Sequence, residues 1–141
     1  MNPPRVGQVL PPLVIDRVDP ERMKVMALLL HDPNPIHFDP SSVVALGSDP
    51  RVINQGPISL GYVVTMLEAW LGAQNRLRNI QCRYLANVRA GDSVSVGGEV
   101  VELATSDRGE ALARCAVWLD VAGGPRALEG TATVLLPVPS G

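Results

Sequence analysis

The sequence predicts an α+β domain in which one long apolar helix packs against an antiparallel sheet. Residues 57–71 are mostly apolar, with Glu68 as the only charged residue, and a helix that is apolar nearly all round must be buried. The second half of the chain alternates apolar and polar residues in four segments separated by turn residues, a pattern typical of antiparallel strands. A chain of 141 residues can form one domain with a sizeable core, so we expect a single domain over residues 1–141.

An arm and two short helices are expected first. Residues 6–15 are apolar but contain two consecutive prolines, which favours an edge strand or an extended arm. Asp19 can cap a helix that begins at Pro20. That helix should end near His31, because the next residue precedes a proline. A short helix over 39–47 should follow.

The apolar helix and the four strands complete the fold. After a loop over 48–56, Pro57 should begin the helix and Gly72 should end it. Alternation of apolar and polar residues predicts the four strands. Their expected ranges are 78–88, 93–103, 111–121 and 126–136.

Composition excludes several classes of protein. The net charge is −2, which does not favour a nucleic-acid partner. No apolar run is long enough to span a membrane and no signal segment is apparent, so we expect a cytoplasmic protein with no membrane partner. Cys82 and Cys115 lack the spacing of a metal site, and we expect both to be buried free thiols.

Residues 32–37 read Asp-Pro-Asn-Pro-Ile-His and form the candidate catalytic segment. Each proline fixes its own φ and keeps the preceding residue out of helical space, so we expect a stiff, extended loop. Such a loop would hold Asp32 and His37 at a fixed separation. An acid and a base held in this way can act on one water molecule, as required to add water to a double bond or to remove it. The alternative is a set of ordinary turn residues with a histidine at the rim of the core.

The segment 32–37 resembles the signature of the MaoC-like, R-specific enoyl-thioester hydratases, also called hydratase 2. Residues 52–57 resemble the stretch that opens the family's central helix, and residues 83–92 resemble its aromatic strand and turn. The three blocks occur in the family's order and at its spacing. The resemblance implies the hotdog fold, in which a twisted antiparallel sheet wraps a long buried helix.

The resemblance also implies an activity and a set of site residues. The activity is (R)-specific hydration of trans-2-enoyl thioesters, or the reverse dehydration of 3-hydroxyacyl thioesters. His37 would take a proton from water, since imidazole exchanges protons near neutral pH, and Asp32 would hold the same water and act as the acid. Asn34 would orient this pair or the loop. Gly56 would place a backbone N–H of the helix N-terminus near the thioester oxygen.

The implied partners are an acyl-CoA or acyl-carrier-protein thioester and a second hotdog chain. The dimer would be formed with an identical chain or with a related one. No cofactor and no metal are implied. A metal site built from residues of the 31–39 segment is disfavoured, because the prolines direct neighbouring side chains apart.

Four positions depart from the family pattern, including Leu30 in place of a small residue and Asn87 in place of proline. His31 stands where the family has glycine, and Gln55 stands where it has histidine. We include both among the candidate substrate-binding residues, with Asn34 and Gly56. His31 could instead point to solvent at the end of its helix, where a partial positive charge is favoured.

Two other functions share this scaffold. A hotdog thioesterase generally needs a carboxylate near the start of the central helix, whereas the only acid in this helix is Glu68, about 16 Å along the axis. A non-catalytic subunit that supports an active partner need not keep Asp32 and His37. The presence of both residues favours the enzyme.

Overall fold

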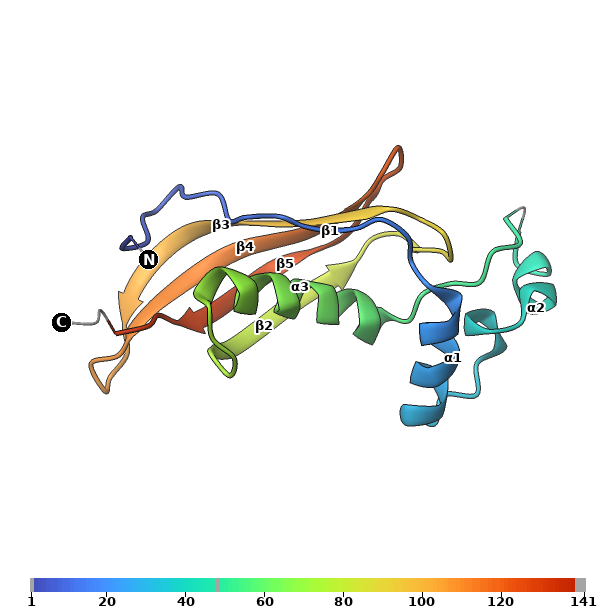
Figure 1. The fold of residues 1–141 in the computed structure, drawn as a ribbon, viewed down its shortest axis with the longest axis horizontal. Helices are drawn as coiled ribbons and strands as arrows, with labels where there is room; N and C mark the ends of the chain where they lie inside the picture. The colour runs from blue at the N-terminus through green and yellow to red at the C-terminus, as the bar shows by residue number, and fades with distance from the viewer. Residues whose placement is uncertain (1, 48, 139–141) are drawn as a thin grey trace.

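The structure, a computed structural model, describes residues 2–47 and 49–138. Its elements follow one another along the chain as shown in Figure 1. In order they are β1 (Leu13–Ile15), α1 (Pro20–Leu29), the 3-10 turn η1 (Pro35–His37), α2 (Pro40–Val44), α3 (Gly56–Leu71), β2 (Leu77–Tyr84), β3 (Val94–Thr105), β4 (Ala111–Val121) and β5 (Arg126–Leu135).

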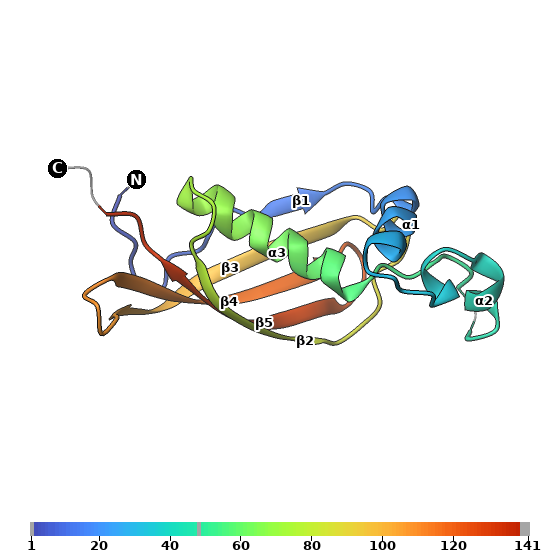
Figure 2. The same ribbon diagram turned by 90° about the horizontal axis from the view of Figure 1, so that it is seen from below.

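The five strands form one antiparallel sheet with the order β1-β3-β4-β5-β2. Figure 2 shows α3 lying along one face of this sheet, while α1 and α2 extend beyond its end. The core between helix and sheet is aliphatic, as the scarcity of aromatic residues predicts. The expected α+β hotdog architecture is therefore confirmed.

The central helix α3 begins and ends close to the predicted residues. Gln55 is its N-cap, and Gly72 ends it in the left-handed region with φ 63°, a conformation that glycine adopts without strain. One face is buried against the sheet. Gly61, Thr65 and Ala69 on the opposite face are exposed. The expectation of a helix buried all round is thus wrong for the single chain, because the sheet covers only one side.

Several boundaries differ from the sequence prediction. The helix α1 ends at Leu29 rather than near His31. The strand β2 ends at Tyr84 rather than at residue 88, because the segment after it leaves the sheet and the Val88 carbonyl accepts from the Asn54 N–H at 2.7 Å. Of the expected loop over 48–56, residue 48 lies outside the described residues.

Both cysteines are free. Cys115 is buried, as expected, whereas Cys82 is only partly buried on the edge strand. In the part of the chain that the structure describes, no helix combines the length and the apolar character needed to cross a membrane.

Candidate active site

The loop after α1 is held by short-range hydrogen bonds from side chain to backbone. The Asp32 carboxylate accepts from the Asn34 N–H at 3.0 Å, and the Asn34 side-chain oxygen accepts from the Ile36 N–H at 3.3 Å. Asn34 therefore caps η1, with Pro35 at its first position. The expected extended conformation is correct only up to Asn34. Residues 35–37 form a 3-10 turn instead, because the cap and the proline favour a helical start.

This turn brings His37 back toward Asp32. Nε2 of His37 lies 3.4 Å from Oδ2 of Asp32. The His37 side chain is 12% exposed and that of Asp32 is 31% exposed, so solvent can reach the space between them. One water molecule can contact both groups at this separation.

The other ring nitrogen of His37 has a single polar partner. Nδ1 lies 2.7 Å from the carbonyl oxygen of Ile53. A carbonyl can only accept, so Nδ1 carries the proton in this hydrogen bond. In the neutral ring Nε2 then has a free lone pair, and this lone pair is on the side of Asp32. His37 is therefore a base whose free nitrogen is oriented toward the Asp32 carboxylate.

His37 and Gly56 line the same cavity of about 240 Å³. Gly56 lies at the first position of α3, where backbone N–H groups have no partner within the helix and the helix dipole is positive. The Gln55 side chain makes no cap bond to these groups. The cavity thus joins a base to an N–H donor of the kind that stabilises a developing oxyanion.

Tyr84, at the end of β2, packs directly on Gly56. A Cβ atom built on Gly56 would lie 2.8 Å from the Tyr84 ring carbon Cζ, closer than carbon atoms approach in folded proteins. A side chain at position 56 would therefore displace the half-exposed Tyr84 ring. Tyr84 also lines the cavity.

A second, larger groove of about 650 Å³ borders Asp32 from the other side. The exposed Leu28 and Phe38 line it, together with Lys24. Asp32 thus lines an apolar groove, whereas His37 lines the smaller cavity beside α3.

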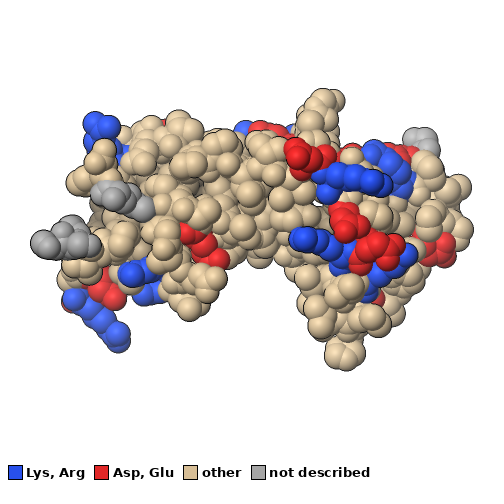
Figure 3. All heavy atoms as spheres, in the orientation of Figure 1, with Lys and Arg blue, Asp and Glu red and all other residues tan. Residues whose placement is uncertain are grey.

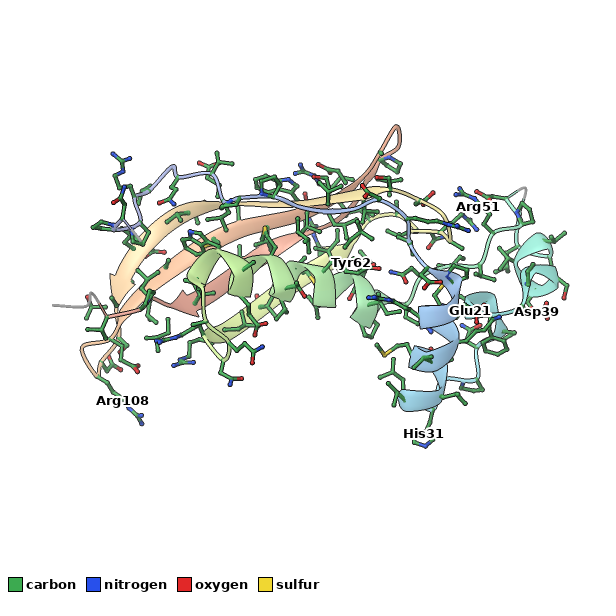
Figure 4. The ribbon with its side chains drawn as sticks, in the orientation of Figure 1. Glu21, His31, Asp39, Arg51, Tyr62 and Arg108 are labelled. Atoms are coloured by element: carbon green, nitrogen blue, oxygen red, sulfur yellow. The ribbon has the colours of Figure 1, made fainter. Side chains whose placement is uncertain are left out.

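The remaining predicted site residues lie apart from the cavity. Gln55 is 1% exposed, and its Nε2 donates to the Met23 carbonyl at 2.8 Å, so it ties the start of α3 to α1. His31 is exposed at the tip of α1 and points away from the body of the molecule (Figure 4). It lies at the rim of the apolar groove. Asn34 is exposed and acts as the cap of η1.

Four polar residues that line the cavity were not predicted as site residues: Asn54, Ser59, Tyr84 and Asn87. The Asn54 amide nitrogen donates to the Ser59 hydroxyl at 3.0 Å, and both side chains are buried. Asn54 and Ser59 are polar residues close to Gly56 in a largely apolar stretch, and this pattern could have indicated that they belong to the site. Among the described residues, no group of three or more His, Cys, Asp or Glu side chains could hold a metal ion.

Comparison with known proteins identifies the family. A sequence model described as MaoC like domain matches residues 5–115. The chain belongs to the MaoC-like domain family. No curated protein sequence matches it.

Solved structures agree with this assignment. An (R)-hydratase from A. caviae involved in PHA biosynthesis superimposes with a TM-score of 0.81 at 25% identity, covering 97% of this chain and 100% of that one. The ChsH1-ChsH2 complex from Mycobacterium tuberculosis includes a chain with a TM-score of 0.78 at 26% identity, with 94% and 98% covered. The R-hydratase PhaJ1 from Pseudomonas aeruginosa gives 0.78 at 21% identity, with 94% and 82% covered, and shows the fold alone. The family and the (R)-hydratase support a general hydratase or dehydratase role for this MaoC-like chain.

Proposed function

We propose that this MaoC-like chain hydrates trans-2-enoyl thioesters to (R)-3-hydroxyacyl thioesters, or catalyses the reverse dehydration. The observation that carries the proposal is the orientation of His37. Its Nδ1 is bound to a carbonyl, its Nε2 lies 3.4 Å from Asp32, and its ring shares a cavity with Gly56. These are the base, the acid and the oxyanion donor that addition of water to an enoyl thioester requires.

Asp32 and His37, which we call the dyad, would act on one water molecule. His37 Nε2 removes a proton from water while the water oxygen bonds to C3 of the enoyl group, and the double-bond electrons move toward the thioester carbonyl. The proton taken by His37 then passes through Asp32, whose Oδ2 lies 3.4 Å from Nε2, to C2, so that both residues return to their starting protonation states. If both residues act on one water molecule from the same side of the substrate, the water oxygen and the proton add to the same face.

The enolate oxygen would lie at the N-terminus of α3. The Gly56 N–H and the helix dipole stabilise negative charge there. Pro57 has no N–H, so the next residue in the chain cannot supply a second donor. Loss of one such donor typically raises a barrier by about 3 kcal/mol.

The geometry does not favour a thioesterase. Glu68 lies near the C-terminal end of α3 and does not line the cavity that His37 and Gly56 share. A carboxylate in that place cannot reach a carbonyl bound at the start of the helix. Hydrolysis would therefore need to use Asp32 or His37, whose positions suit the addition of water to a carbon–carbon double bond.

We also propose that the protein pairs with a second hotdog chain, in the first instance a copy of itself. Within the described sheet, β2 is hydrogen-bonded only to β5, and its other edge is unpaired. An exposed strand edge of eight residues is a site for pairing with another chain. A second candidate function, a subunit that supports a different active chain, is favoured by the likeness to one chain of the ChsH1-ChsH2 complex.

The experiment is an absorbance assay of enoyl-thioester loss with crotonyl-CoA and with a longer 2-enoyl-CoA. The purified chain is expected to consume at least one of them and to form the (R)-3-hydroxyacyl product, identified by chiral chromatography. Sedimentation analysis of the same sample gives the oligomeric state. A dimer that leaves every enoyl-CoA and enoyl-carrier-protein thioester unchanged would contradict the enzyme and favour the supporting subunit.

A further inference from the structure

Four charged residues outside the cavity form a connected cluster, which we call the Arg51 clasp: Asp49, Arg51, Arg89 and Asp92. The first two precede α3, and the other two belong to the turn between β2 and β3. Figure 3 shows acidic and basic side chains gathered at the end of the molecule that carries α1 and α2, and Figure 4 places Arg51 on the loop that leads to α3.

Arg51 joins the loop to the turn through its guanidinium. Its Nη1 lies 2.6 Å from Asp92 Oδ1, and its Nη2 lies 2.8 Å from Asp49 Oδ2. Arg89 adds a contact from the turn, since its Nη1 donates to the Arg51 carbonyl at 2.9 Å. Hydrogen bonds from Arg51 lower the pKa of Asp49 to about 2, so this carboxylate is charged at neutral pH.

The backbone of residues 52–54, which follows Arg51, is hydrogen-bonded to the segment that carries His37. The Val52 carbonyl accepts from the Ala90 N–H at 2.9 Å, and the Asn54 N–H donates to the Val88 carbonyl at 2.7 Å. Between these two bonds, the Ile53 N–H donates to the Ile36 carbonyl of η1 at 2.9 Å. Residues 52–54 are therefore fixed between the turn and the segment that carries His37.

The Ile53 carbonyl is the partner of His37 Nδ1. Burial of the Val52 and Ile53 side chains anchors this segment, but hydrophobic burial is non-directional. Hydrogen-bonded ion pairs of arginine with carboxylates have a defined geometry. The clasp therefore adds a directional restraint at Arg51, immediately before the hydrogen-bonded residues 52–54, and holds the loop and the β2–β3 turn together on that side of Ile53.

We propose that the Arg51 clasp positions His37: by fixing residues 52–54 it holds the Ile53 carbonyl against Nδ1 and keeps the Nε2 lone pair directed at Asp32. Arg51 is thus a positioning residue of the site. The effect on the imidazole is independent of any reaction, whereas the effect on rate rests on the proposed function. Exposed ion pairs usually add little to stability. A positioning role therefore predicts a change in the His37 tautomer when Arg51 is replaced, whereas a merely stabilising role predicts an unchanged tautomer.

The test is to measure the tautomer of His37 by nitrogen-15 NMR in the full chain. With only His31 and His37 present, a His31→Gln variant assigns the two rings. The wild type is expected to show His37 with its neutral proton on Nδ1. Arg51→Met is expected to raise the fraction of His37 that carries the proton on Nε2. Arg51→Lys keeps the positive charge but cannot bind two carboxylates through a planar guanidinium, so this fraction should be intermediate.

Arg126→Met is the matched control. Arg126 forms an exposed ion pair with Asp120 at 2.8 Å at the β4–β5 turn, and that pair makes no contact with residues 52–54. In the hydration assay, Arg51→Met should lower kcat by about tenfold with KM changed less than about twofold, whereas Arg126→Met should match the wild type.

The same tautomer in Arg51→Met and Arg126→Met would overturn the proposal. If Arg51→Met fails to fold, Arg51→Lys decides in the same way, because an unchanged tautomer there also contradicts the positioning role. A shifted tautomer in a chain that hydrates no thioester would support the positioning role and reject the proposed function.

Discussion

The carbonyl oxygen of Ile53 lies 2.7 Å from Nδ1 of His37, and this contact determines which ring nitrogen is free to act as a base. The two residues are 16 positions apart in the sequence. One belongs to η1 and the other to the loop that leads into α3. The candidate site therefore depends on a long-range contact as much as on the loop over residues 32–37.

Gly56 is expected to be indispensable for two separable reasons. Gly56→Ala should displace the Tyr84 ring, which a Cβ atom would approach to 2.8 Å, and should lower both activity and stability. Adding Tyr84→Ala removes the steric conflict and should recover part of the folding stability in urea titration. Recovery of full activity in the double variant would show that close approach of substrate to the backbone at Gly56 is not needed.

Gln55 is expected to act on stability rather than on substrate binding. Gln55→Met removes a side-chain donor from the Met23 carbonyl, which keeps its partner within α1, and should lower the free energy of unfolding by about 1 kcal/mol. Because the side chain is buried and does not line the cavity, KM for the enoyl thioester should change by less than about twofold. A large rise in KM at unchanged stability would restore the sequence-based prediction of a substrate-binding role.

His31 is expected to be replaceable by glycine with a gain in stability. Its φ is 49°, in the left-handed region where side chains are disfavoured. His31→Gly should raise the free energy of unfolding by about 1 kcal/mol. It should leave turnover of short enoyl thioesters close to that of the wild type, because the side chain is exposed. Selective loss of turnover would place His31 in contact with the substrate.

Cys115 should resist thiol reagents in the folded protein. Burial raises the pKa of its thiol to about 11, so the reactive thiolate is scarce at pH 8 and the side chain is also inaccessible. Burial also raises the pKa of the Cys82 thiol, but this side chain is only partly buried. A labelling time course should therefore show Cys82 reacting before Cys115, and both reacting rapidly in urea. Rapid labelling of Cys115 without denaturant would contradict the packing.

Local sequence signals predicted the elements well where periodicity is strong. The range 111–121 expected for one strand is that of β4, because alternation is uninterrupted there and both flanking turns contain glycine. Proline and glycine marked the limits of α3 for equally local reasons. The sequence predicted that the two prolines would hold Asp32 and His37 at a fixed separation, but not the 3-10 turn that brings the two side chains to 3.4 Å.

Contacts between distant segments were not predictable in this way. The position of Ile53 between η1 and the β2–β3 turn depends on three segments far apart in the sequence. The packing of Tyr84 on Gly56 likewise joins the end of a strand to the start of a helix. The premature end of β2 has the same origin, since Val88 uses its carbonyl to bind Asn54 instead of a strand.

The most direct measurement is the hydration rate of the best enoyl thioester with Asp32→Asn, His37→Gln and the double variant. All three are first checked for native folding by circular dichroism. If both residues act on one water molecule, each single substitution should lower kcat by about 1,000-fold or more, and the double variant should be little worse than the weaker single one. Single variants that retain most of the wild-type rate would contradict the dyad, and so would effects that multiply in the double variant.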